Sequence, residues 1–322
     1  MAAPSDAHSR ALVPLRDIRP SDLDVILEEE EQAWRHELDW NFRPSADLVR
    51  RFVGMRALNG HALWLNGRAI GYCYHVSEDR KGLIGDIYVL REFASPHHEN
   101  FLLAAAVSSM MESPFVRRIE SQLMMLRDPF RRELPHPEFL RRHARNFMRT
   151  GLAAARRLPP GKAAHRILLE PWSEAREEDA ARLIAAAYEG HIDGEINDQY
   201  KSVPGARRFV TNIVQYPGCG AFFQPASFLA LDPRDGILTG LCLSSLVADN
   251  VGHLTQVCVA PQAQATGIGY ELMRRALAAL ADHGCDRVSL TVTAANLNAV
   301  MLYQRMGFHI HRLFAAFVWE AF

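Results

Sequence analysis

The sequence has few cysteines and no long hydrophobic run. Its five cysteines are an odd number without a Cys-x-x-Cys pair, which argues against a disulfide framework and against a zinc site. The longest apolar run, residues 101–107, is too short to span a bilayer, and the first residues lack the apolar core of a signal peptide. We therefore expect a cytoplasmic protein with reduced thiols, no metal and no membrane partner.

An excess of one charge is also absent. The 36 Lys and Arg residues nearly balance the 37 Asp and Glu residues, and the formal net charge is −1. Such a chain has no broad field that would draw it onto nucleic acid, so we expect no nucleic-acid partner. Its 322 residues exceed one average domain, which predicts two domains and leaves the oligomeric state open.

The order of the expected elements repeats once along the chain. The first half is expected to hold strands, a helix and a final strand within residues 62–76, 82–90, 99–113 and 117–126. The second half repeats this order, beginning with a hairpin that turns at Asp235 and Gly236, within residues 227–247, 253–259, 270–284 and 287–293. The offset of about 170 residues predicts two copies of one α+β unit.

A cluster of helix breakers marks the expected boundary between the copies. Pro159, Pro160 and Gly161 end an Arg-rich stretch that is interpreted as a solvated linker helix. We place the junction near Arg156, which gives domains 1–155 and 156–322.

The most informative segment joins an apolar strand to a helix through a glycine-bearing turn. The first amide groups of a helix lack intrahelical partners and lie at the positive end of the helix dipole, so they bind anions. Gly267 and Gly269 carry no β-carbon that would hold a ligand away from the backbone, and Gln264 adds a polar side chain. The turn predicts a pyrophosphate site, although two glycines near a helix start are weak evidence alone.

A second ordered motif follows at residues 290–308. It combines a strand, a polar break and a short helix, and its marked positions are Asn296, Ala299, Leu302, Tyr303, Gly307 and Phe308. With this second motif, the chain from about residue 165 onward resembles the GNAT superfamily of N-acetyltransferases. The pyrophosphate loop of that family reads Gln or Arg, then x-x-Gly-x, then Gly or Ala, and Gln264, Gly267 and Gly269 fill it.

The resemblance implies a fold and an activity. The expected fold is α+β, with the α/β three-layer GNAT arrangement in two tandem GNAT-like domains whose mixed, mostly antiparallel sheets are flanked by helices. The expected reaction moves an acetyl group from acetyl-CoA, as co-substrate, directly to an amine of a small molecule or peptide. In the family, strands four and five separate to admit the pantetheine arm, and here they correspond to residues 253–259 and 288–293.

The resemblance also assigns the cofactor-binding residues. The backbone of Val257, Cys258 and Val259 would contact the pantetheine and the acetyl carbonyl. The pyrophosphate would lie on the loop residues Gln264, Ala265, Thr266, Gly267, Ile268 and Gly269. Asn296 would bind near the pantetheine, or act only as a helix cap. Tyr303 would lie beside the sulfur and protonate the leaving thiolate as general acid, the alternative being an aromatic packing residue.

The general base and the acceptor site are less clearly marked. Thr291 stands where many relatives carry Glu, so His253 is the predicted base, with a solvent-facing histidine or a water relay as alternatives. A cationic amine would be attracted by Asp193, Glu195 and Asp198 between Tyr188 and Tyr200, a group that is equally typical of a solvated helix end.

The first copy lacks the glycine turn. Its corresponding segment, residues 90–105, has no glycine and contains Arg91, His97 and His98. The first domain is therefore predicted to be a degenerate GNAT-like domain without a cofactor loop. The alternative to an enzyme is a non-catalytic acyl-CoA-binding sensor or protein-interaction module.

Overall fold

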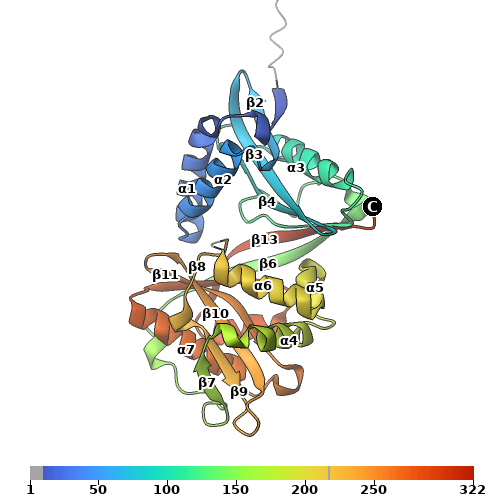
Figure 1. Ribbon diagram of the computed structural model, residues 1–322. Coiled ribbons are helices and arrows are strands. Elements are labelled where there is room, and N and C mark those ends of the chain that lie inside the picture. The colour runs from blue at the N-terminus through green and yellow to red at the C-terminus, as the bar shows by residue number, and fades with distance from the viewer. Residues whose placement is uncertain (1–9, 217) are drawn as a thin grey trace, which may run out of the picture. The chain divides into compact units, whose positions relative to one another are not determined.

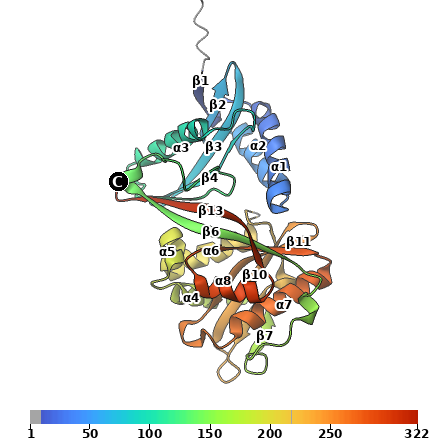
Figure 2. The ribbon, with the colours of Figure 1, turned by 180° about the vertical axis from the view of Figure 1, so that it is seen from behind.

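The computed structural model describes residues 10–216 and 218–322, which contacts divide into two compact units. Within the described residues, the first unit contains 10–143 and 314–322, and the second contains 144–313. Each unit is a mixed sheet with helices on both faces (Figures 1 and 2). The predicted α+β unit is thus present twice.

In the first unit the strand order is β1-β2-β3-β4-β5-β13, with β4 and β5 parallel and the other neighbours antiparallel. The strands are β1 (Arg10–Pro14), β2 (Asn59–Leu65), β3 (Arg68–Glu78), β4 (Lys81–Val89), β5 (Arg118–Gln122) and β13 (His309–Glu320). The helices are α1 (Asp24–Leu38), α2 (Arg43–Gly54) and α3 (Pro96–Met111), with short 3-10 helices at Leu15–Asp17, Pro20–Leu23 and Pro137–Phe139.

In the second unit the strand order is β6-β12-β11-β10-β9-β7, with β11 and β12 parallel and with β8 paired to β10. The strands are β6 (Leu140–Gly151), β7 (Leu168–Pro171), β8 (Ala221–Phe222), β9 (Phe228–Leu231), β10 (Leu238–Ala248), β11 (Val251–Val259) and β12 (Arg287–Thr293). The helices are α4 (Glu177–Ala187), α5 (Ile192–Ile196), α6 (Val203–Gln215), α7 (Ile268–His283) and α8 (Leu297–Arg305). Short 3-10 helices lie at Ala155–Arg157, Glu174–Arg176, Asp198–Lys201, Gln224–Ala226 and Pro261–Ala263.

Two strands belong to the sheet of the opposite half of the sequence. Residues 145–151 of β6 pair antiparallel with β12, and residues 316–320 of β13 pair antiparallel with β5. The observed units therefore differ from the predicted domains 1–155 and 156–322. A breaker cluster marks where the chain can change direction, but strand pairing is decided by hydrogen bonds between residues far apart in sequence.

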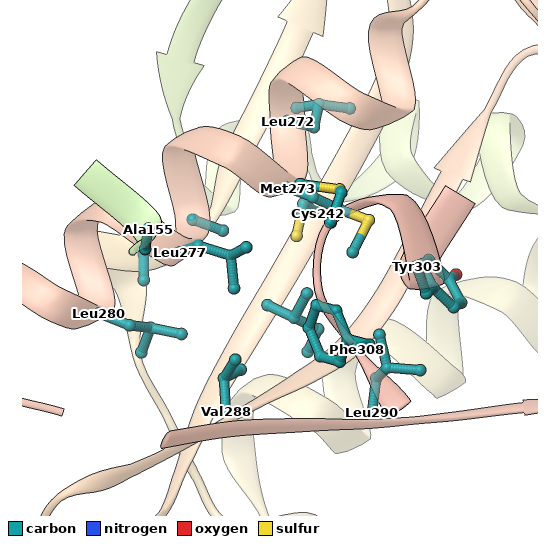
Figure 3. Close-up of a cluster of buried hydrophobic side chains, with 14 of the residues drawn as sticks. Ala155, Cys242, Leu272, Met273, Leu277, Leu280, Val288, Leu290, Tyr303 and Phe308 are labelled. Atoms are coloured by element: carbon teal, nitrogen blue, oxygen red, sulfur yellow. The ribbon is translucent and has the colours of Figure 1, made fainter. Parts of the chain in front are cut away.

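Helix α7 illustrates why these residues form these elements. Its apolar positions recur at helical spacing, and the side chains of Leu272, Met273, Ala276, Leu277 and Leu280 are all buried, as predicted. They pack against side chains from β10, β12 and the segment that ends at Phe308 (Figure 3). Gly284, at φ 105°, ends the helix in the left-handed conformation that glycine favours.

The second sheet buries both of its faces. Leu241 and Leu243 of β10 pack in the cluster that contains α4 and α6, whereas Cys242, between them, packs in the cluster that contains α7. This alternation follows from the two-residue period of a strand. The predicted hairpin is also confirmed: β9 and β10 are joined by a turn in which Gly236 has φ 71°. Among the described residues, no helix is both long and apolar enough to cross a membrane.

Candidate active site

The parallel strands of the second unit pair along only part of their length. β11 and β12 are in register from Val251 opposite Arg287 to Leu254 opposite Leu290, and β11 then continues to Val259 without this partner. Past Leu254, the backbone N–H and C=O groups of β11 that face β12 have no hydrogen-bond partner in that strand and require a different one. The strands therefore separate where the resemblance implied a pantetheine cleft.

The glycine turn leads directly from this separated end of β11 into α7. Gly267 is the residue before the helix and has φ 97°, a conformation that glycine adopts without steric cost. It offers no side-chain cap, so the first amide groups of α7 keep the capacity to bind an anion. The side chains of Gln264, Ala265 and Thr266 are exposed, whereas Ile268 is buried and can contribute only its backbone.

The second glycine of the turn is not required by internal packing. A β-carbon placed on Gly269 would lie 3.6 Å from Val259 Cγ2 and 3.7 Å from Leu302 Cδ2, which are ordinary contacts. Gln264 Nε2 donates to the carbonyl of Val259 at 3.4 Å, and Thr266 Oγ1 donates to Ala263 at 2.6 Å. The loop is thus held by its own side chains and leaves room at Gly269.

A cavity of about 120 Å³ lies beside the separated strands, wholly within the second unit. Residues from β6, β11, β12, α5, α8 and the ends of α4 and the 3-10 helix Asp198–Lys201 line it: Arg145, Tyr188, Asp193, Tyr200, Leu254, Thr255, Gln256, Val257, Leu290, Thr291, Val292, Asn296, Ala299 and Tyr303. The cavity therefore joins the predicted thioester site to the predicted acceptor site.

Two stacked tyrosines form the aromatic part of the wall. The rings of Tyr188 and Tyr200 have centroids 4.4 Å apart and planes 16° apart. Gln256 Nε2 donates to Tyr188 Oη at 2.8 Å, and Tyr200 Oη donates to Gln256 Oε1 at 3.5 Å. Burial raises the pKa of Tyr188 well above that of a free phenol, so its hydroxyl stays protonated. This wall is neutral and polar at one edge.

An ion pair forms the charged part of the wall. Arg145 Nη1 donates to Asp193 Oδ1 at 3.1 Å and to Thr293 Oγ1 at 3.3 Å, and Arg145 Nη2 donates to Thr291 Oγ1 at 3.3 Å. Thr293 Oγ1 also donates to Asp193 Oδ1. The side chains of Arg145 and Asp193 are 11% and 13% exposed, so the pair is largely shielded from solvent. Shielding makes this interaction stronger than a surface ion pair.

Tyr303 and Asn296 both line the cavity, from α8 and from its first cap position. Tyr303 is buried and lies in the cluster with Leu290 and Phe308 (Figure 3). Burial raises the pKa of Tyr303 above that of a free phenol, so it holds its proton at neutral pH. Asn296 Oδ1 accepts from the amide of Ala299 at 3.2 Å, so Asn296 caps α8.

The structure does not place His253 where a general base is needed. His253 lies in the paired part of β11, is 3% exposed and does not line the cavity. Its Nδ1 is 2.9 Å from Ser289 Oγ, and burial lowers its pKa to about 3. A neutral imidazole enclosed in the sheet has no path to an amine in the cavity. Counting residues along a strand did not reveal where the two strands separate.

The other predicted residues divide into two groups. Val257 lines the cavity, while Cys258 is buried, and burial raises the pKa of its thiol to about 12. Cys258 is therefore a packing residue and not a nucleophile. Of the three acidic residues, only Asp193 lines the cavity, and Glu195 instead lies 3.7 Å from Lys201 Nζ. Among residues 10–216 and 218–322, no cluster of His, Cys, Asp and Glu side chains is arranged to hold a metal ion.

Gln256 and Arg145 line the cavity and were missed by sequence reasoning. Gln256 follows an irregularity in the pairing of β10 with β11, and Leu254 and Cys258 pack in different clusters, so the two-residue period of a strand did not indicate which way its side chain faces. Arg145 carried no signal either: it lies in the Arg-rich stretch interpreted as a linker, and only the pairing of β6 with β12 brings it to this cavity.

Comparison with known proteins gives the class of the second unit. Residues 161–308 match the family model described as acetyltransferase (GNAT) family, so this part of the chain is a GNAT acetyltransferase domain. Among curated proteins, a mycothiol acetyltransferase from Saccharopolyspora erythraea is 38% identical over 88 residues. The match spans 27% of this chain and 29% of that protein, less than a third of either.

Solved structures extend the likeness to the whole chain. A GCN5-related N-acetyltransferase from Sphaerobacter thermophilus matches with a TM-score of 0.66 at 15% identity, covering 99% of this chain and 97% of that one. A tandem GNAT protein from the clavulanic acid biosynthesis pathway matches with a TM-score of 0.59 at 15% identity, covering 98% and 99%. At such identities the likeness concerns the fold, and the chain has the fold of two tandem GNAT-like domains.

Proposed function

We propose that the protein transfers the acetyl group of acetyl-CoA to an amine in the cavity of its second unit. The observation that carries this proposal is the combination of three features: the unpaired edge of β11, the glycine turn that connects β11 to α7, and Tyr303 in the cavity beside β11. The first two fit the diphosphate and amide-rich arm of a coenzyme. When bound, acetyl-CoA supplies the acetyl group as a thioester.

The residues present fit that co-substrate. A β-carbon on Gly269 would make only ordinary contacts, so packing inside the protein does not require a glycine at this position. A ligand that approaches the backbone closely would require one. The amides of Gly267 to Gly269 would hold the pyrophosphate, with Gln264, Ala265 and Thr266 exposed around it. The backbone from Val257 to Val259 would pair with the pantetheine, and an amide near Cys258 would stabilise the oxyanion.

The cavity side chains have distinct roles in the proposed transfer. The amine nitrogen forms the new bond to the carbonyl carbon, and the carbon–sulfur bond breaks. Tyr303 is protonated at neutral pH and would give its proton to the departing sulfur. Asp193 is the carboxylate that lines the cavity, and it receives the amine proton directly or through water.

Two measurements test the proposal together. Calorimetric titration should give saturable binding of acetyl-CoA, and a thiol assay over a panel of amines should detect release of coenzyme A with at least one acceptor. Absence of affinity for any coenzyme A species would refute the proposal. Binding without turnover across the panel would favour the acyl-CoA sensor or interaction module instead.

A further inference from the structure

One donor of Arg145 has no partner although it is buried. Among the described residues, no acceptor lies within hydrogen-bond distance of Arg145 Nε, while Nη1 and Nη2 contact Asp193, Thr293 and Thr291. Leaving a buried donor of a charged group unsatisfied is energetically unfavourable. Arg145 is among the residues that line the cavity, and Nε is the part of its guanidinium that makes no hydrogen bond to the described residues.

The geometry of a guanidinium selects the ligand group. Nε and Nη2 form one edge with two parallel N–H donors, which matches the two oxygens of a carboxylate. Nη1 is occupied by Asp193 Oδ1 at 3.1 Å, whereas Nη2 has only the contact to Thr291 at 3.3 Å. The edge that carboxylates prefer is therefore the one with the fewest partners.

The same wall holds a negative group for the amine. Asp193 Oδ1 accepts from Arg145 and Thr293, and Oδ2 lies 3.5 Å from His191 Nδ1. The cavity thus presents both signs of charge within one hydrogen-bonded pair. A ligand with one amine and one carboxylate complements both, whereas a simple cationic amine leaves Arg145 Nε unsatisfied.

We propose that the acetyl acceptor is a small amine that carries a carboxylate, as an α-amino acid does, and that Arg145 binds this carboxylate. The proposal rests on the acetyltransferase function proposed above and specifies its substrate class. In the transfer the amine nitrogen is acetylated, its proton leaves to Asp193 or water, the thiolate takes the Tyr303 proton, and the carboxylate is unchanged.

The wild-type protein provides the first test. Release of coenzyme A is measured for the standard α-amino acids, each compared with its own carboxamide, which differs only in the loss of the carboxylate charge. We expect kcat/KM to be at least about tenfold higher for the best amino acid than for its carboxamide, because the carboxamide lacks the charged hydrogen-bonded pair with Arg145. The carboxamide has the less basic amine, so basicity alone would favour the opposite order.

Variants of two arginines on the same strand provide the second test. Arg145→Lys keeps the charge and removes the two-donor edge, so the ratio of amino acid to carboxamide should fall close to one while calorimetry shows unchanged affinity for acetyl-CoA. Arg149→Lys is the matched control, because Arg149 lies on β6 and does not line the cavity. It should keep the wild-type ratio.

The outcomes separate the two proposals. Equal rates for amino acids and their carboxamides, or an Arg145→Lys variant that binds acetyl-CoA and keeps the wild-type ratio, would overturn the carboxylate proposal and leave the acetyltransferase function standing. If no amine is acetylated, amino acids are titrated calorimetrically into the protein with coenzyme A. Binding that requires both the carboxylate and Arg145 would then support a carboxylate site at Arg145 while the proposed acetyl transfer fails, and absence of such binding would end both proposals.

Discussion

The two units share their strand order and differ at the helix that follows the first strand of the parallel pair. In the second unit α7 begins after Gly267, which has no side chain to cap the helix. In the first unit α3 begins after Ser95, whose Oγ accepts from the amide of His98 at 3.2 Å, and Pro96 has no amide hydrogen. The donors that an anion needs are thus satisfied or missing in the first unit.

The units also differ in the side chains that lie beside the separated part of the parallel strands. β4 and β5 pair only as far as Ile84 and Ser121, so the first sheet opens in the same way as the second. There, however, the ring of Tyr74 covers Gly85 so closely that an added β-carbon would lie 2.1 Å from its Cε2.

Buried carboxyl groups are a second feature of the first unit. Glu30 is fully buried and accepts from Tyr72 Oη at 2.7 Å and from Trp34 Nε1 at 3.2 Å. Asp86, on the part of β4 that is not paired with β5, interacts electrostatically with Glu30. The separated part of β4 therefore lies beside buried carboxyl groups and a tyrosine ring, whereas the separated part of β11 lies beside a cavity.

The largest expected effect comes from removing the proposed acid. Tyr303→Phe should lower kcat by about 100-fold or more, because proton transfer by a positioned acid contributes about 100- to 10,000-fold. Its affinity for acetyl-CoA in calorimetry should remain that of the wild type. Tyr74→Phe, the tyrosine in the opening of the first unit, is the control and should keep wild-type turnover. Equal rates for the two variants would remove Tyr303 from the mechanism.

A smaller effect is expected from filling the glycine turn. Gly269→Ala should weaken acetyl-CoA binding by about tenfold, or about 1.4 kcal/mol, because the new methyl group holds the pyrophosphate off the amides. Its Tm should change little, since a β-carbon there makes only ordinary contacts. Gly151→Ala is the control: a β-carbon there would lie 3.8 Å from the nearest atom, Asp286 O.

The wild type should bind one acetyl-CoA per chain, and a stoichiometry of two would contradict the difference between the units.

The buried carboxyl groups should make the first unit sensitive to pH. Burial raises the pKa of Asp86 to about 6 and raises the pKa of Glu30 well above its usual range, with the neighbouring Asp86 charge adding to the rise. The folded state then binds more protons than the unfolded state. The stability that these two protonated carboxyl groups contribute is present at acidic pH and is lost as pH rises through about 6, the pKa of Asp86, and through the higher pKa of Glu30.

Thermal unfolding at a series of pH values measures this dependence. In Glu30→Gln the decline of Tm with rising pH should be shallower than in the wild type, because one buried proton no longer has to be released. Each kcal/mol corresponds to about 2 to 4 °C for a unit of this size. Glu28→Gln removes an exposed carboxyl group from the same helix and serves as the control. A wild-type Tm that rises over this range would contradict the assignment.

The smallest expected effect concerns the cap of α3. Ser95→Ala should reduce the free energy of unfolding by about 1 kcal/mol, because an N-cap side chain is lost. Urea denaturation measures that loss. Acetyl-CoA binding should stay at one site per chain, since Pro96 still lacks an amide hydrogen and the ring of Tyr74 still lies against Gly85. A second binding event in this variant would show that the cap alone distinguishes the units.

Local pattern was enough to predict most elements of both units. The face formed by Leu272, Met273 and Leu277 follows from helical spacing, and the turn at Gly236 follows from its dipeptide. The glycine turn and Tyr303 were found because each motif is contiguous in sequence. His253 was misassigned because pattern alone does not show that β11 and β12 are still paired at that position.

By itself, therefore, the sequence determined the two α+β units, the helix with its glycine turn, and the position of Tyr303 seven residues after Asn296, which caps α8. These features depend on residues close together in the chain. Tertiary structure alone decided that β6 pairs with β12 and that Arg145 thereby reaches the cavity beside Asp193. Hydrogen bonds between strands carry no local signature, because any extended segment is able to make them.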